Sequence, residues 1–95
     1  NGHVTVTLIL DESNDPLGEA WVDVRGLPLT GKGSRDLVET LEGDLSEFLD
    51  GASQKLLADD DKLEEALKRA VRQVAMEEIG KKPEVIVVIS RLSAE

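Results

Sequence analysis

The sequence predicts a single α+β domain, in which a three-stranded sheet carries two antiparallel helices packed on one face, in the chain order β-β-α-α-β. Three patterns lead to this prediction. Apolar and polar residues alternate over 3–10, apolar stripes at steps of three and four residues cover 37–56 and 63–79, and a continuous apolar run covers 85–89. The 95 residues suffice for one hydrophobic core, so the domain is expected to span residues 1–95.

The first two strands are expected to form a hairpin. Residues 3–10 have the period of a strand with one buried face. Turn-forming residues fill 11–18 and reverse the chain before a second alternating strand over 20–25, which leaves Trp21 on its outer face. In the first strand, the inner face is expected to carry Val4, Val6, Leu8 and Leu10, and the outer face Thr5, Thr7 and Ile9.

The first helical stripe predicts one amphipathic helix of about 23 residues that extends to Leu56. Ser34 is a suitable N-cap for it. Gly43 and Gly51 are weak points, since glycine in a helix costs about 1 kcal/mol relative to alanine. The exposed side of this helix is strongly acidic.

The second stripe predicts a helix over 63–79 that ends at Gly80, because glycine readily adopts the left-handed conformation of a helix C-terminus. Pro83 prevents the helix from continuing. Glu64 and Lys68 are spaced as a favourable ion pair within the helix. With Lys68, Arg69 and Arg72, this is the basic helix of the two.

The run from Pro83 to Ile89 predicts a strand buried on both faces, around which the rest of the chain is organised. Two helices can cover only one face of the sheet. We therefore expect another copy of the chain, or another domain, on the outer face. The residues expected to form this candidate partner interface are Trp21, Thr5, Thr7, Ile9, Ile86 and Val88. A tryptophan partly covered by its own loops is the alternative.

Composition limits the chemistry that this domain can perform. It has no cysteine and one histidine, His3, so neither a thiolate site nor a catalytic zinc centre built on imidazoles can be assembled. No catalytic, cofactor-binding or metal-binding residue is assigned. No apolar run approaches the length of a membrane span. The net charge of −9 disfavours contact with a phosphate backbone.

Two local motifs suggest sites, and each has a simpler interpretation. The stretch from Gly26 to Lys32 matches G-x-x-x-x-G-K, but Gly33 stands where a nucleotide-binding loop has the Ser or Thr that binds Mg²⁺, which favours a plain loop. The aspartates of 59–61 could chelate a cation, but their place at a helix start favours capping.

Lys81 and Lys82 follow the second helix and could contact phosphate. A basic pair at a helix C-terminus is also favoured by the helix dipole, which is the simpler explanation.

The whole chain resembles the C-terminal domain of bacterial ribonuclease J. The resemblance rests on residues 2–11, on Val24-Arg25-Gly26-Leu27-Pro28, and on Lys81-Lys82-Pro83 with the strand that follows. It implies a parent enzyme with a metallo-β-lactamase domain and a β-CASP domain, which degrades and matures RNA as a cytoplasmic 5′-to-3′ exonuclease and endonuclease. The chain starts at Asn1 and enters a strand at His3, as expected of a domain excised from such a parent.

The resemblance also implies a role. In the family, this domain is associated with dimer and tetramer assembly, while zinc belongs to the catalytic domain of the parent. We therefore expect a non-catalytic assembly module whose partners are other domains of the parent or another copy, with RNA bound through the parent. The alternative is a module that binds RNA or a degradosome partner through Lys68, Arg69 and Arg72, with Lys81 and Lys82 as further contacts.

Overall fold

The computed structural model describes residues 2–31, 33 and 35–92. The strands are β1 (His3–Leu10), β2 (Trp21–Arg25) and β3 (Glu84–Arg91). The helices are α1 (Leu37–Asp50), the four-residue α2 (Gln54–Leu57) and α3 (Asp60–Ile79). The α+β class and the order β-β-α-α-β are confirmed, with α2 as a short addition between the two long helices.

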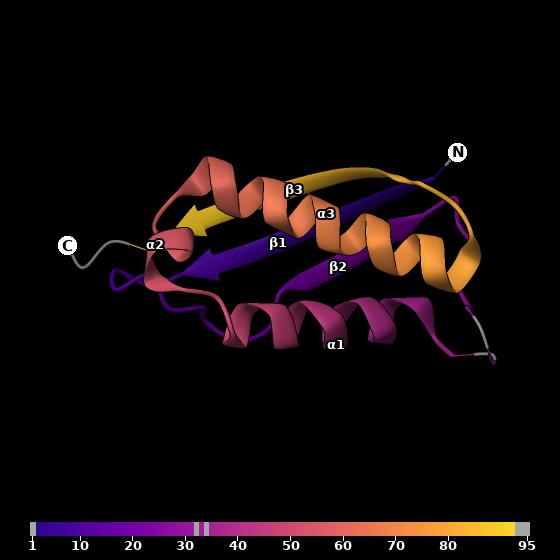
Figure 1. The fold of residues 1–95 in the computed structure, drawn as a ribbon, viewed down its shortest axis with the longest axis horizontal. Helices are drawn as coiled ribbons and strands as arrows, with labels where there is room; N and C mark the ends of the chain where they lie inside the picture. Colours follow the sequence, from indigo (N-terminus) through magenta and orange to yellow (C-terminus); the bar gives the residue numbers. More distant parts are fainter. Residues whose placement is uncertain (1, 32, 34, 93–95) are drawn as a thin grey trace.

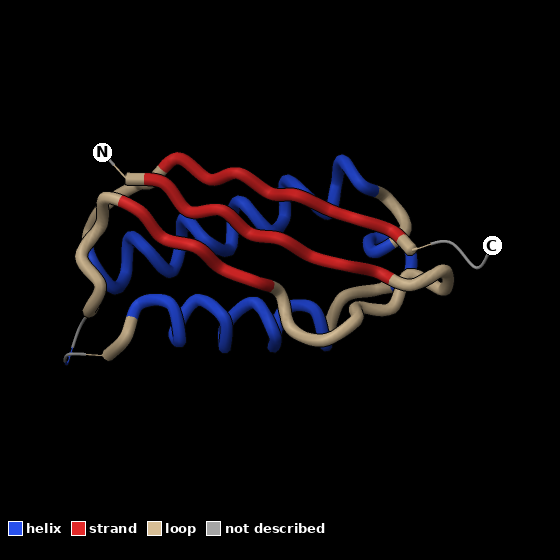
Figure 2. Tube along the Cα trace, turned by 180° about the vertical axis from the view of Figure 1, so that it is seen from behind, coloured by secondary structure: helices blue, strands red, loops and turns tan. Residues whose placement is uncertain are grey.

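The sheet described by these residues has the strand order β2-β1-β3. β1 pairs with β2 in antiparallel orientation, as expected of a hairpin, and with β3 in parallel orientation. The sheet is therefore mixed, and the chain from 26 to 83 crosses from one of its edges to the other. Figure 1 shows α3 in front of the strands and α1 alongside β2, with α1 and α3 running in opposite directions, and Figure 2 shows the strands from the opposite side.

The core lies between the sheet and the helices. The inner face of β1 is buried as predicted, and each of its apolar residues contributes about 1.5–3 kcal/mol when it is removed from water. Both long helices contribute a stripe of leucines and valines to the same core. These core residues are Val4, Val6, Leu8 and Leu10 of β1, Leu37, Leu41, Leu45 and Leu49 of α1, and Leu63, Leu67, Val71 and Val74 of α3.

The prediction of one long first helix is wrong. α1 ends at Asp50 with Gly51 as its C-cap, and the Ser53 hydroxyl accepts a hydrogen bond from the Leu56 N–H and starts α2. Because the new turn buries Leu57, the apolar stripe continues although the helix does not. The N-cap of α1 is Asp36, whose carboxylate accepts a hydrogen bond of 3.0 Å from the Glu39 N–H. The predicted cap, Ser34, lies outside the described residues.

The prediction that the last strand is buried on both faces, and that the chain is organised around it, is also wrong for the described chain. β3 is an edge strand and β1 is the central one. Val85 is buried, whereas Ile86 and Val88 on the other face are 46% and 44% exposed. Five consecutive apolar residues do not distinguish a strand covered on both faces from an edge strand with one uncovered apolar face.

The second long helix matches its prediction. Gly80 is the C-cap in the left-handed conformation, with φ of 67°, and its N–H donates to the Met76 carbonyl. At the other end, the Asp59 carboxylate accepts a hydrogen bond of 3.0 Å from the Lys62 N–H, which confirms the capping interpretation.

Candidate protein interface

The sheet surface that faces away from the helices is called the open face here. Alternation along each strand assigns its residues, and none of them belongs to the buried core among the described residues. The open face consists of His3, Thr5, Thr7 and Ile9 of β1, Trp21, Asp23 and Arg25 of β2, and Glu84, Ile86, Val88 and Ser90 of β3.

The strand register brings the predicted interface residues together. Thr7 of the central strand lies between Trp21 on one side and Val88 on the other. In the next row, Thr5 lies between Asp23 and Ile86. The sequence patterns placed these residues on one face, and the register makes them neighbours across it.

The middle of the open face is apolar and accessible. Trp21 is 74% exposed, so its own loops do not cover it. The alternative, a tryptophan partly covered by its own loops, would leave this large exposed area unchanged. Ile86 and Val88 are also exposed, and Ile9 of the central strand is partly exposed. A large aromatic side chain beside branched aliphatic ones is the composition found at the centre of protein interfaces.

Two further leucines extend this apolar area. The Leu17 N–H donates to the Ile9 carbonyl at 2.8 Å, and the Leu92 N–H donates to the Leu10 carbonyl at 2.9 Å. They are 44% and 54% exposed. Sequence reasoning missed both because they lie outside the strand patterns. Leu92 could have been recognised from the sequence, because it continues the every-second-residue pattern of Ile86, Val88 and Ser90.

The opposite end of the open face is charged. The first row places His3 between Arg25 and Glu84, which lie on opposite edges of the sheet. Arg25 also forms an exposed ion pair of 3.0 Å with Asp23.

The weaker candidates for contact with RNA or a partner lie elsewhere. Lys68 of α3 pairs with Glu64 at 3.0 Å, as the spacing predicted, while Arg69 and Arg72 are exposed on the same helix. Lys81 and Lys82 lie beyond the end of α3 and line a small pocket of about 210 Å³ with Gly2, Gly26 and Leu27.

The helical side of the molecule is acidic where α1 meets α3. Burial raises the pKa of the Asp44 carboxyl above its ordinary value, and the neighbouring carboxylates of Glu47 and Glu77 raise it further. These groups border a groove of about 370 Å³ whose lining includes Phe48 and Val74. Their negative potential opposes the approach of a phosphate backbone to α3.

The Gly26–Lys32 loop has a geometry that disfavours nucleotide binding. The Gly31 N–H donates to the Arg35 carbonyl at 2.7 Å instead of pointing at a ligand. A Cβ atom on Gly31 would lie 2.5 Å from Oε1 of Glu78, so a carboxylate packs directly against the loop. The Glu78 side chain is only 10% exposed and accepts a hydrogen bond of 3.0 Å from Arg35. Lys32, the lysine of the motif, lies outside the described residues.

Neither a metal site nor a membrane-spanning helix is present in the part of the chain that the structure describes. No group of three or more His, Asp or Glu residues there could hold a metal ion. None of the described helices is long and apolar enough to cross a membrane. His3 is an exposed residue at the start of β1.

Comparison with known proteins relates the chain to a family and to a curated protein. The family model described as the ribonuclease J C-terminal domain matches residues 1–92. A protein named ribonuclease J from Sinorhizobium meliloti (strain Sm2011 / Rm2011 / 2011) is 33% identical over 91 residues, which cover 96% of this chain and 16% of that protein. The chain therefore spans a small part of the length of the curated relative that it matches.

Proposed function

Because the chain belongs to the ribonuclease J C-terminal domain family, we propose that it is the non-catalytic assembly module of a longer ribonuclease J-like enzyme. Its open face is the surface through which two copies associate. The parent degrades and matures RNA as a cytoplasmic exonuclease and endonuclease, with zinc chemistry in another domain. RNA reaches the enzyme through that domain.

The observation that carries this proposal is the exposed apolar centre of the open face. Trp21, Ile86 and Val88 lie in two adjacent rows of the open face, and each exposes much of its apolar side chain. A contiguous exposed apolar patch of this kind often marks an interaction site. Burying them against a second copy recovers hydrophobic free energy, and a large aromatic residue at such a centre is typical of a binding hot spot.

The residues present support a non-catalytic role. A zinc centre of the kind that activates water needs several imidazole or carboxylate ligands around one point. The sequence has one histidine and no cysteine, and the described residues contain no group of three or more His, Asp or Glu that could hold a metal ion. These residues do not fit the zinc site of the parent, and no chemical step is assigned to them.

The size of the open face indicates how strong the association is. Strands of eight, five and eight residues, with a rise of about 3.3 Å per residue and a spacing of about 4.8 Å, give a flat area of roughly 330 Å². A stable, specific interface buries about 800 Å² on each partner. The open face alone therefore supports a weak dimer, which further contacts of the parent enzyme would strengthen.

The alternative, binding of RNA or a degradosome partner through α3, has less support. Lys68 is engaged by Glu64, and the acidic groove between α1 and α3 lies on the same side of the sheet. A titration that detects salt-dependent RNA binding by the 95-residue chain, lost in Arg69→Glu/Arg72→Glu, would favour the alternative.

Sedimentation equilibrium of the chain and of Trp21→Glu over a wide concentration range tests the assembly role. We expect the unmodified chain to self-associate and the variant to have a dissociation constant raised at least about tenfold, since hot-spot residues contribute about 2 kcal/mol or more. Fluorescence of Trp21, which is the only tryptophan, should shift to the blue as the dimer forms.

Leu29→Glu is the matched control, because Leu29 is a large exposed apolar residue in the loop between β2 and α1. It should associate like the unmodified chain. If Trp21→Glu also associates like the unmodified chain, or if the unmodified chain is still monomeric at about 1 mM, the proposal is wrong.

A further inference from the structure

Charged and apolar side chains are separated along the open face. The row formed by Arg25, His3 and Glu84, called the charged row here, lies at the end where β1 begins. Ile9 lies near the other end of β1, with Leu17 bonded beside it. A partner that covers the whole face must therefore match charge at one end and apolar surface at the other.

Two identical sheets can pack face to face about a two-fold axis in two ways, with their strands antiparallel or parallel. In the antiparallel arrangement, the charged row faces the Ile9 end of the partner. His3 would then face Ile9 of the partner subunit, and Glu84 would face the partner subunit's Ser90. Neither Arg25 nor Glu84 would meet an opposite charge, which costs free energy because buried charges need partners. In the same arrangement, Trp21 would face Asp23 of the partner subunit.

The parallel arrangement lets the charges of the charged row pair with each other, although Asp23 then faces Ile86 of the partner subunit. Each row faces the same row of the other copy with its two edges exchanged, because the axis runs along the central strand. Arg25 on the β2 edge then meets Glu84 of the partner subunit, and Trp21 meets the partner subunit's Val88. The axis passes over Thr5 and Thr7, whose small side chains allow the two central strands to approach.

We propose that two copies pack open face against open face about a two-fold axis parallel to β1, so that Arg25 of each copy pairs with Glu84 of the partner subunit. This proposal rests on the proposed assembly function and adds the orientation of the partner. Symmetry produces the Arg25–Glu84 pair twice. Asp23 keeps its contact with Arg25 of its own chain at 3.0 Å.

Charge reversal in two separate chains tests the orientation. In the Arg25→Glu dimer, two acids face each other across the interface, and in the Glu84→Arg dimer two bases do. Because like charges repel, each variant alone should dimerise about tenfold more weakly at low ionic strength. An equimolar mixture of the two variants restores both pairs across the interface. We expect the mixture to form a heterodimer with the affinity of the unmodified chain, measured by sedimentation equilibrium and by native mass spectrometry.

Arg72→Glu and Glu65→Arg serve as matched controls, because they change the net charge equally but lie on exposed positions of α3. Neither should weaken the dimer comparably, and mixing them should not favour a heterodimer. Circular dichroism melting curves of all four variants check that each is folded.

The results separate this proposal from the one on which it rests. If Trp21→Glu abolishes association but Arg25→Glu and Glu84→Arg show no preference for each other, the orientation is wrong and the interface stands. If Trp21→Glu leaves association unchanged, the interface and the orientation are both wrong. A heterodimer preferred over either homodimer supports the parallel arrangement.

Discussion

The two faces of the central strand have opposite environments, although their residues alternate along the same backbone. Leu8 faces the helices and is 1% exposed, whereas its neighbours Thr7 and Ile9 lie partly exposed on the open face. The apolar side chains of the covered face are buried against the apolar stripes of α1 and α3. The open face also carries apolar residues, but no helix among the described residues covers it (Figure 2). This difference separates residues that stabilise the monomer from residues that are available to a partner.

The largest expected effect comes from truncating the covered face. Leu8→Ala should lower the free energy of unfolding by about 3 kcal/mol, because it removes buried methyl groups and leaves a cavity. That loss is a large part of the roughly 5–15 kcal/mol that stabilises a typical domain. Urea unfolding at low protein concentration measures it without a contribution from the dimer.

Ile9→Ala is the matched control on the open face, one residue along the same strand. It should cost less than about 1 kcal/mol in the same experiment, because the side chain is already partly exposed. It should also weaken self-association, which Leu8→Ala should affect only through folding. Equal losses of monomer stability in the two variants would contradict the distinction between the faces.

The same distinction explains what the sequence could predict. A period of two assigns every residue of β1 to a face, so the core residues and the open-face threonines were predicted correctly. The period does not reveal which strands are neighbours. The β2-β1-β3 order, and with it the row that joins Arg25 and Glu84, comes only from the structure.

The errors have local physical causes. The helical stripe continues through Ala52 and Leu56, so periodicity alone hides the break at Gly51. The apolar run of β3 predicted two covered faces, because apolar residues that await a partner have the same pattern as residues already buried. Leu17 and Leu92 lie outside the strand patterns, although both adjoin the open face through backbone hydrogen bonds.

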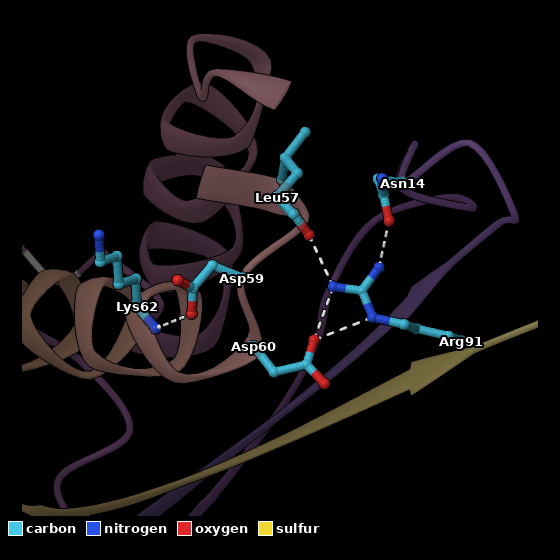
Figure 3. Close-up of polar contacts among 6 residues, drawn as sticks. All are labelled: Asn14, Leu57, Asp59, Asp60, Lys62 and Arg91. Atoms are coloured by element: carbon cyan, nitrogen blue, oxygen red, sulfur yellow. Dashed lines mark hydrogen bonds and ion pairs between the residues drawn. The ribbon is translucent and has the colours of Figure 1, made fainter. Parts of the chain in front are cut away.

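Arg91, at the end of β3, makes a group of polar contacts on the covered side of the sheet. Arg91 continues the covered-face alternation of Val85, Val87 and Ile89, and its guanidinium ties the strand to three other parts of the chain (Figure 3). It donates to the Leu57 carbonyl at 2.7 Å and to Asp60 Oδ1 at 2.6 and 2.9 Å. It also donates to the Asn14 side chain.

We therefore expect Arg91→Ala to lower the free energy of unfolding by about 1–2 kcal/mol, because four charge-assisted hydrogen bonds, of which the one to the Leu57 carbonyl is partly buried, are lost together. Arg69→Ala, at an exposed position of α3, is the control and should change stability by less than about 0.5 kcal/mol. Urea unfolding of both variants measures the difference. If the two variants are equally stable, the contacts of Arg91 contribute nothing to holding the covered layers together.

The smallest expected effect concerns the helices that provide the cover. The pKa of Asp44 is raised in the folded chain, first by burial and then by the carboxylates of Glu47 and Glu77. In the pH range between its ordinary and its folded pKa, the folded chain binds more protons than the unfolded one, so stability falls as the pH rises through that range. The unfavourable contribution is then fully present at neutral pH.

Asp44→Asn removes this contribution and should increase the free energy of unfolding at pH 7 by up to about 0.5 kcal/mol. The gain should vanish below the ordinary carboxyl pKa of 3.8, where Asp44 is neutral in both states. Glu12→Gln in the exposed hairpin loop removes the same unit charge and controls for the net charge of −9. Urea unfolding of both variants at pH 7 and pH 3 measures the effect. If the gain in the free energy of unfolding is equal in the two variants, or persists at pH 3, its cause is the overall charge and not the crowding of carboxylates where α1 meets α3.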